Sequence, residues 1–148
     1  MKLTSAIRQE FSRQIKNLRN RPFLEGAMAT AALVAMADQD VRLSEQLALD
    51  HLLDELEVLQ DFDPHDAVNL HRRYVEKMRS DPVAGKAVAL QAISKFKGDT
   101  EHAATLLLVG IGIAKADSEF SDEEHAMLIE ICETLELAPE EALAQLLE

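Results

Sequence analysis

Residues 37–45 read ADQDVRLSE, and residues 116–124, which lie 79 positions later, read ADSEFSDEE. The two stretches align without a gap, and in each an aspartate comes second, another acid fourth and a glutamate ninth. The same frame continues into the apolar positions before them, where Val34 pairs with Ile113. A frame that holds at core and acidic positions alike predicts an internal duplication of a helix–loop–helix unit.

Apolar residues recur at helical spacing along nearly the whole chain, and no stretch alternates convincingly at the two-residue period of a strand. Asp63-Pro64 and Asp81-Pro82 each combine an N-cap aspartate with a proline at the first helical position. Gly98 is a stop signal, after which Asp99 or Thr100 caps the next helix. The predicted helices cover residues 3–19, 22–37, 44–59, 63–79, 81–96, 99–116, 121–137 and 139–147.

These elements predict an all-α fold, a compact bundle of seven to eight helices that forms one domain over residues 1–148. Residues 1–20 are expected to form a basic amphipathic N-terminal helix. Residues 23–59 and 102–137 are the two predicted repeats, and residues 60–98 supply the helices between them. A hydrophobic content of 47% suffices for a core without covalent staples.

Composition and charge exclude several classes of protein. The single cysteine, Cys132, excludes a disulfide framework and is typical of a reducing compartment. The longest apolar run, residues 103–114, is far shorter than the ~20 residues of a membrane-spanning helix. The net charge of −12 argues against nucleic acid as a partner, because phosphate backbones are bound by clustered Lys and Arg. We therefore expect a cytoplasmic protein.

The N-terminal segment differs in charge from the rest of the chain. Residues 1–21 hold six Lys or Arg against one acid, Glu10, which gives +5 and leaves −17 for the remainder. An amphipathic helix at residues 3–19 with this charge suits peripheral contact with a membrane surface. It suits equally a helix whose apolar face packs on the bundle, and this interpretation is favoured because large interfacial aromatic residues are lacking.

The duplicated segments supply six candidate ligands for a divalent cation such as calcium or magnesium: Asp38, Asp40, Glu45, Asp117, Glu119 and Glu124. Hard cations prefer several carboxylate oxygens presented by a tight turn. Each segment begins like an EF-hand loop but is too short and lacks the glycine of the sharp turn. Six carboxylates exceed the needs of one ion, so either two ions bind or only some of the acids are ligands.

Helix capping is the alternative explanation of these acids. Ser121 and Glu124 form the S-x-x-E pattern of a capping box, which satisfies backbone amides without a metal. Capping does not account for Asp38 and Asp117, which end the preceding helices, where the helix dipole disfavours negative charge. Two carboxylates about 4 Å apart repel by roughly 4 kcal/mol at an effective dielectric of about 20. If the loops meet, a cation, Lys115 or a basic partner must therefore neutralise them.

The two segments resemble the tellurite-resistance TerB family, whose repeats carry the signature Ala-Asp-Gly-x-Ile/Val-x-x-x-Glu. Residues 37–45 and 116–124 occupy this signature, and the stretches RPFLE at 21–25 and GIGIAKAD at 110–117 are also similar to the family. The resemblance implies an all-α domain of a bacterial cytoplasmic protein, at the inner face of the membrane, that serves resistance to tellurite and similar agents. It implies as partners other proteins of a resistance gene cluster, some of them membrane-bound.

The family's suspected metal site maps first onto four acids and more weakly onto Asp40 and Glu119; the four are Asp38, Glu45, Asp117 and Glu124. The family's glycine is replaced by Gln39 in the first segment and by Ser118 in the second. Arg42 stands where the second segment has its capping serine, so the second segment is the better candidate for a metal site.

Motifs of catalysis are missing from the sequence. The five histidines show no metalloprotease spacing and are expected at the surface, and Cys132 is expected to be buried on an apolar stripe. No Walker loop, dinucleotide fingerprint or nucleophile elbow occurs. The sequence predicts a non-enzymatic module whose acidic loops bind divalent cations, a protein partner or both. The alternative is a metal-free protein–protein interaction module that is membrane-peripheral through its N-terminal helix.

Overall fold

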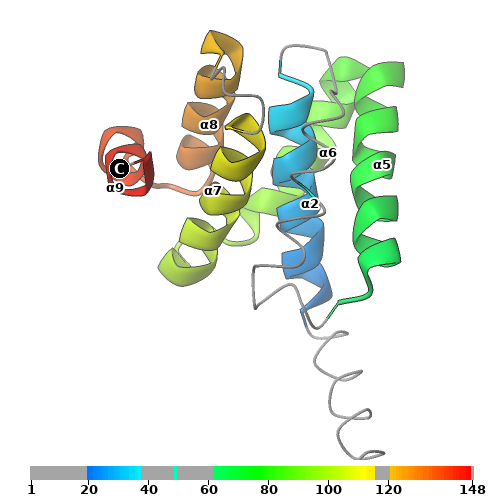
Figure 1. The fold of residues 1–148 in the computed structure, drawn as a ribbon, viewed down its shortest axis with the longest axis horizontal. Helices are drawn as coiled ribbons and strands as arrows, with labels where there is room; N and C mark the ends of the chain where they lie inside the picture. The colour runs from blue at the N-terminus through cyan, green and yellow to red at the C-terminus, as the bar shows by residue number, and fades with distance from the viewer. Residues whose placement is uncertain (1–19, 38–48, 50–61, 116–120, 148) are drawn as a thin grey trace, which may run out of the picture.

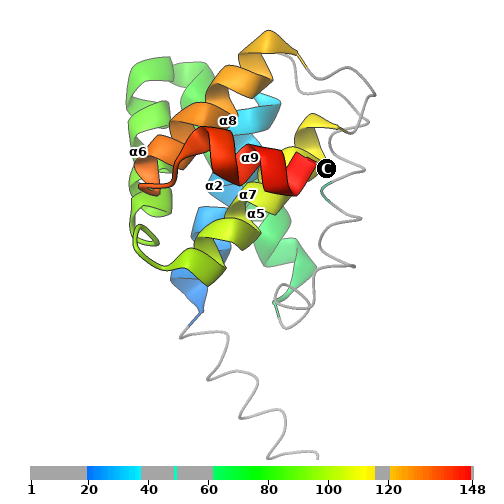
Figure 2. The same ribbon diagram turned by 90° about the vertical axis from the view of Figure 1, so that its left-hand side faces the viewer.

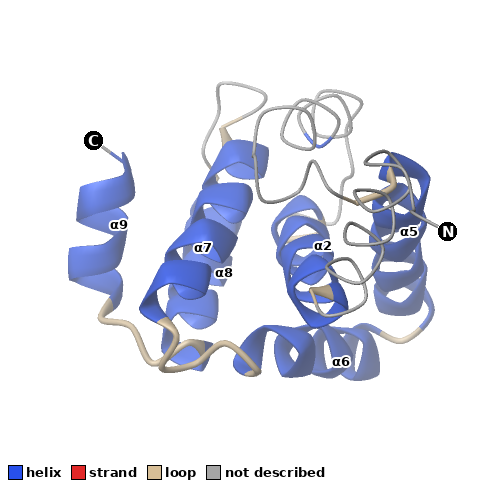
Figure 3. Cartoon of the chain, turned by 90° about the horizontal axis from the view of Figure 1, so that it is seen from below, coloured by secondary structure: helices blue, strands red, loops and turns tan. Residues whose placement is uncertain are grey.

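The computed structural model describes residues 20–37, 49, 62–115 and 121–147, and the regular structure of this part of the chain is entirely α-helical (Figures 1 and 3). The prediction of an all-α fold is therefore confirmed. Apart from Leu49, the predicted helices at 3–19 and 44–59 lie outside the described residues, so the number of helices stays a prediction. The described helices are α2 (Arg21–Ala35), α5 (Pro64–Ser80), α6 (Pro82–Ser94), α7 (Thr100–Ala114), α8 (Asp122–Thr134) and α9 (Pro139–Leu147).

Three of these helices begin where the sequence predicts an aspartate cap. In each, a side-chain oxygen accepts a hydrogen bond from a backbone amide of the first turn: His65 to Asp63 at 2.9 Å, Ala84 to Asp81 at 3.2 Å and His102 to Asp99 at 3.3 Å. A proline follows the cap in α5 and α6, where its missing N–H is not needed. The predicted helix starts are confirmed at these positions.

Helix ends are predicted less well, because several helices stop two or three residues early. The observed last residues are Ala35 rather than 37, Ser94 rather than 96, Ala114 rather than 116 and Thr134 rather than 137. In α8 the cause is Glu136, which adopts a left-handed backbone conformation with φ of 59°. The amide of Leu137 then donates to the carbonyl of Cys132 at 2.9 Å, which is the Schellman arrangement that terminates a helix.

Among the described helices α2 is central and packs against α5, α6, α7 and α8 (Figure 1). Twelve of its 15 residues are buried, and five of these are alanines, whose small side chains let neighbouring helices approach closely. Thr30 is a polar residue in this core. Its hydroxyl donates to the carbonyl of Gly26 at 2.8 Å, which satisfies the group without a partner from another helix.

Glycines allow close contacts of the helices around α2. α6 lies behind α2 in the view of Figure 1 and runs from the end of α5 toward the start of α7 (Figure 3). At the contact between α5 and α6, a Cβ on Gly85 would lie 2.6 Å from the backbone N and Cα of Met78. At the meeting point of α2, α7 and α8, a Cβ on Gly110 would lie 2.9 Å from Leu128 Cδ2 and 3.1 Å from Thr30 Cγ2.

α9 lies across α8 and α7 on the outside of the bundle (Figure 2). Leu143 anchors it, with only 5% of its surface exposed. None of the helices in the described residues combines the length and the apolar composition needed to cross a membrane.

α2 and α7 occupy equivalent positions in the two predicted repeats. Each has 15 residues, and α7 begins and ends 79 positions after α2. They also end in the same way. The amide of Met36 donates to the carbonyl of Ala32 at 2.9 Å, and the amide of Lys115 donates to the carbonyl of Ile111 at 3.0 Å. The helix that follows α2 in the predicted repeat is described only at Leu49, so the duplication itself stays a prediction.

Candidate functional site

The start of α8 carries the part of the predicted acidic site that the structure describes. Ser121 Oγ accepts a hydrogen bond from the Glu124 amide, and Glu124 Oε1 accepts one from the Ser121 amide, both at 3.1 Å. The predicted capping box is confirmed. Only 2% of the Glu124 surface is exposed, so this acid lies inside the protein at the helix terminus.

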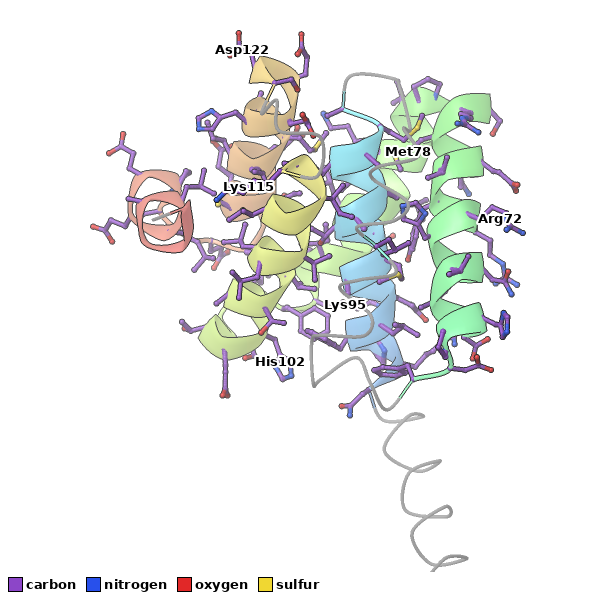
Figure 4. All side chains as sticks on the ribbon, in the orientation of Figure 1. Arg72, Met78, Lys95, His102, Lys115 and Asp122 are labelled. Carbon is purple, nitrogen blue, oxygen red and sulfur yellow. The ribbon has the colours of Figure 1, made fainter. Side chains whose placement is uncertain are left out.

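The partial positive charge of the helix N-terminus also favours acids at the start of α8. Asp122, labelled in Figure 4, and Glu123 precede Glu124 in the first turn, and both are exposed. The free amides of a helix N-terminus carry partial positive charge, which stabilises each nearby acid by about 0.3–1 kcal/mol. Lys115 follows α7, is exposed, and forms no ion pair with any acid of the described residues. Most of the acids that Lys115 was predicted to neutralise lie outside the described residues, so this role stays a prediction.

The other five predicted ligands lie outside the described residues; they are Asp38, Asp40, Glu45, Asp117 and Glu119. Their described neighbours are Ala37 after α2, Lys115 after α7 and Ser121 before α8. These neighbours all stand at one end of the bundle, where α2 and α7 end and α8 begins (Figures 1 and 2). Within the described residues, no three His, Cys, Asp or Glu side chains are grouped as metal ligands.

A pocket that sequence reasoning missed lies between the end of α2, the end of α5, the start of α6 and α8. Its volume is about 410 Å³. Met36, Met78 and Met127 contribute to its apolar wall, and Arg79 and Lys86 contribute positive charge. The sequence gives no signal for this pocket, because its lining comes from segments that are far apart along the chain.

The expectation that the histidines lie at the surface is wrong for His71. This residue is 8% exposed on the face of α5 that packs in the bundle, and burial lowers the pKa of its imidazole to about 4. The ring is neutral at physiological pH. Arg72, the next residue, points into solvent (Figure 4).

At the opposite end of the bundle, the rings of Phe23, Phe96 and His102 pack together with centroids 5.0–5.7 Å apart. The Nδ1 atom of His102 lies 2.6 Å from Asp99 Oδ2. Hydrogen bonds from the His102 ring and from its backbone amide lower the pKa of the Asp99 carboxyl. These contacts hold the start of α7 against α2 and account for both polar side chains, so we assign them a structural role.

Cys132 is fully buried on α8, as the sequence predicts. Burial, and secondarily the negative charge of Glu133, raise the pKa of the Cys132 thiol to about 11. The thiolate is the reactive form, so this cysteine is inert at neutral pH.

Comparisons with known proteins agree with the resemblance seen in the sequence. The family model described as "Tellurite resistance protein TerB" matches residues 24–146. A "Tellurium resistance protein TerB" of Alcaligenes sp. is 30% identical over 109 residues, which cover 74% of this chain and 88% of the relative. No solved structure gives a significant match.

Proposed function

Because the chain belongs to the tellurite-resistance TerB family, we propose that it is a non-enzymatic module of tellurite resistance and related stress responses. In this proposal the segments at residues 37–45 and 116–124 together form a site for divalent cations, calcium or magnesium. Ion binding orders the two segments and so tunes the binding of a protein partner, for which other products of a resistance gene cluster are the candidates. The module works in the cytoplasm, at the inner face of the membrane.

The burial of Glu124 is the observation that carries this proposal. Glu124 ends the second acidic motif, and only 2% of its surface is exposed at the end of the bundle where both acidic segments begin. Burying a carboxylate is costly unless charge or hydrogen bonds compensate it. The capping box supplies one hydrogen bond to this carboxylate, at Oε1, and a cation bound between the segments would add further compensation for its buried charge.

The shared frame of α2 and α7 gives further support. Both helices end at the same end of the bundle, 79 positions apart, and both lead directly into an acidic segment. Duplicated ligands presented from neighbouring helix ends can supply the several oxygens that calcium or magnesium requires.

Thermal unfolding with calcium or magnesium tests the proposal. An ion that binds only the folded chain stabilises it by about 2.7 kcal/mol at a concentration of about 100 times its Kd. We expect either ion at millimolar concentration to raise the Tm of the parent chain, and Glu124→Gln or Asp117→Asn to abolish this rise. Glu124→Gln keeps the oxygen that accepts the Ser121 amide hydrogen bond, so it removes the charge and leaves the cap.

Two further variants separate ion binding from capping. Glu123→Gln removes the same charge from the neighbouring exposed acid and should keep the ion-dependent rise in Tm. Ser121→Ala removes the cap and should lower the Tm with and without ions, while the rise itself persists. No rise with either ion, or an equal rise in Glu124→Gln, would overturn the cation site.

The second candidate function is a metal-free protein interaction module, which the net charge of −12 favours. An acidic surface would bind a basic partner, and salt would weaken the complex. With a purified candidate partner, binding that persists in chelator and falls with salt supports this function. Binding that chelator abolishes supports the cation-dependent module instead. If the module also binds membranes through its N-terminal segment, the full chain should co-sediment with anionic vesicles and a variant without residues 1–19 should not.

A further inference from the structure

The pocket between α2, α5, α6 and α8 has the size and lining of a ligand site. Its volume of about 410 Å³ lies within the range of about 300–1,000 Å³ typical of small-molecule pockets. Three of the five methionines in the chain line it, namely Met36, Met78 and Met127. Methionine side chains are flexible and polarisable, so such a wall can adapt to an apolar chain.

The charged residues of this pocket are both basic. Arg79 and Lys86 line it, and no acid occurs among its described lining residues. Lys86 Nζ lies 2.8 Å from Glu130 Oε2 and its side chain remains 42% exposed, so a ligand carboxylate would share this ammonium group with Glu130. The surrounding residues 77–97 hold five Lys or Arg against one acid, in a chain of net charge −12.

We propose that this pocket binds an amphipathic anion, namely a carboxylate on an unbranched alkyl chain. The alkyl chain packs against the three methionines, and the carboxylate is held by Arg79 and Lys86. Arginine and carboxylate form paired, charge-assisted hydrogen bonds, which fix the head group at the rim. This proposal does not depend on the cation site, since it uses none of the six acids.

Methionine-methyl NMR of the full chain tests the proposal directly, with decanoate as the probe below the concentration at which it forms micelles. We expect saturable shifts of the Met36, Met78 and Met127 methyl signals. Met28 is the internal control: it is fully buried in α2 and does not line the pocket, so its signal should stay in place. Absence of shifts, or equal shifts at Met28, would overturn the proposal.

Chain length and head group test the two halves of the ligand. Each methylene removed from decanoate should weaken binding about fourfold, because the alkyl chain is transferred from water to an apolar wall. Decyltrimethylammonium has the same chain with the opposite charge and should bind at least about tenfold more weakly, since charge-assisted hydrogen bonds are lost. Equal binding of the two probes would contradict the role of the basic residues. If the protein binds anionic vesicles but not monomeric decanoate, this surface contacts a membrane, and the proposed ligand site in the pocket is overturned.

A matched pair of variants on α5 locates the head group. Arg79→Gln should weaken decanoate binding about tenfold, the loss expected for one charge-assisted contact. Lys77→Gln makes the same change in charge within the same last turn of α5, at a residue that does not line the pocket. It should leave the affinity almost unchanged. An equal loss in both variants would mean that only the general field of the region attracts the anion, which contradicts a defined site.

Discussion

His71 shows how one buried side chain sets the response of this fold to acid. Only 8% of its surface is exposed, and burial lowers the pKa of the ring from 6.5 to about 4. Between these two values the unfolded chain binds a proton that the folded chain does not, so stability falls as the pH falls. The stabilisation from a neutral His71 is complete above about pH 6.5 and is lost as the pH falls through about 4.

Replacing His71 with glutamine removes this titration. Between pH 7 and pH 4, the free energy of unfolding of the parent chain should fall by about 3 kcal/mol more than that of His71→Gln. Urea unfolding across this range measures the difference. His65→Gln changes an exposed histidine of the same helix and should keep the pH dependence of the parent. Parallel profiles for the parent and His71→Gln would contradict the prediction.

Glu136 has a backbone conformation that costs folding free energy. Its φ of 59° lies in the left-handed region, which costs a residue with a Cβ about 1–2 kcal/mol. Glu136→Gly should therefore raise the free energy of unfolding by about 1 kcal/mol and the Tm by about 3 °C. Glu136→Ala removes the same charge and keeps the Cβ, so a comparable rise in this control would show that charge, not backbone strain, is responsible.

At the scale of single elements, helix starts could be predicted more exactly than most helix ends. The start of α6 depends on Asp81 and Pro82, two adjacent residues whose roles follow from local chemistry. The end of α8 depends on Glu136 in a conformation that usually takes glycine, so residue type gives no warning. The burial of His71 was also missed, although it lies between Leu70 and Val75 on the stripe of α5 that recurs at helical spacing, because a histidine is expected at the surface by residue type.

Gly85 decides how closely α6 packs on α5. A Cβ at this position would lie 2.6 Å from the backbone of Met78, so Gly85→Ala forces the two helices apart. Overpacking of this kind costs about 1–3 kcal/mol, and it opposes a gain of about 1 kcal/mol in helix propensity. Since the contact is with backbone, we expect a net loss of about 1–2 kcal/mol in the free energy of unfolding.

Chemical denaturation of Gly85→Ala measures this loss. Ala87→Gly on the exposed face of the same helix is the control, because it changes helix propensity alone and should cost about 1 kcal/mol. A Gly85→Ala protein more stable than the parent would mean that the contact between α5 and α6 adjusts without strain.

At the scale of the whole molecule, the local part of the acidic site could be predicted and the pocket could not. The capping box of Ser121 and Glu124 is confirmed because its two partners are three residues apart. The pocket brings Met36, Met78 and Met127 together from three helical regions, and their proximity follows only from how α5, α6 and α8 pack around α2. Tertiary packing, unlike capping, is not encoded in any short stretch of the chain.

The charge of the molecule is segregated along the chain. Residues 116–148 contain 11 acids and no Lys or Arg, whereas residues 77–97 carry a net charge of +4. The described ion pairs are largely exposed, and exposed pairs contribute only about 0–1 kcal/mol each. We therefore expect mutual repulsion of the acids to outweigh the described ion pairs at low ionic strength.

Screening this repulsion should stabilise the protein. Between about 20 mM and about 500 mM sodium chloride, we expect the Tm to rise by a few degrees as the Debye length shortens from about 20 Å to about 4 Å. Glu133→Gln removes an exposed acid from the last turn of α8, where the helix dipole also disfavours it, and should raise the Tm most at low salt. The matched control is Glu76→Gln on α5, an exposed acid next to Lys77 and near Arg72 and Arg73, which should give no such gain.

The same titration separates general screening from a specific cation site. At equal ionic strength, sodium and magnesium chloride should raise the Tm by similar amounts if screening alone acts. A localised ion is required if magnesium raises the Tm more than sodium does and this extra rise saturates at millimolar concentration. Glu124→Gln should then remove the extra rise, and Glu133→Gln should keep it. A Tm that falls with added sodium chloride would contradict this balance of charges, because ion pairs would then contribute more to stability than the repulsion among the acids costs.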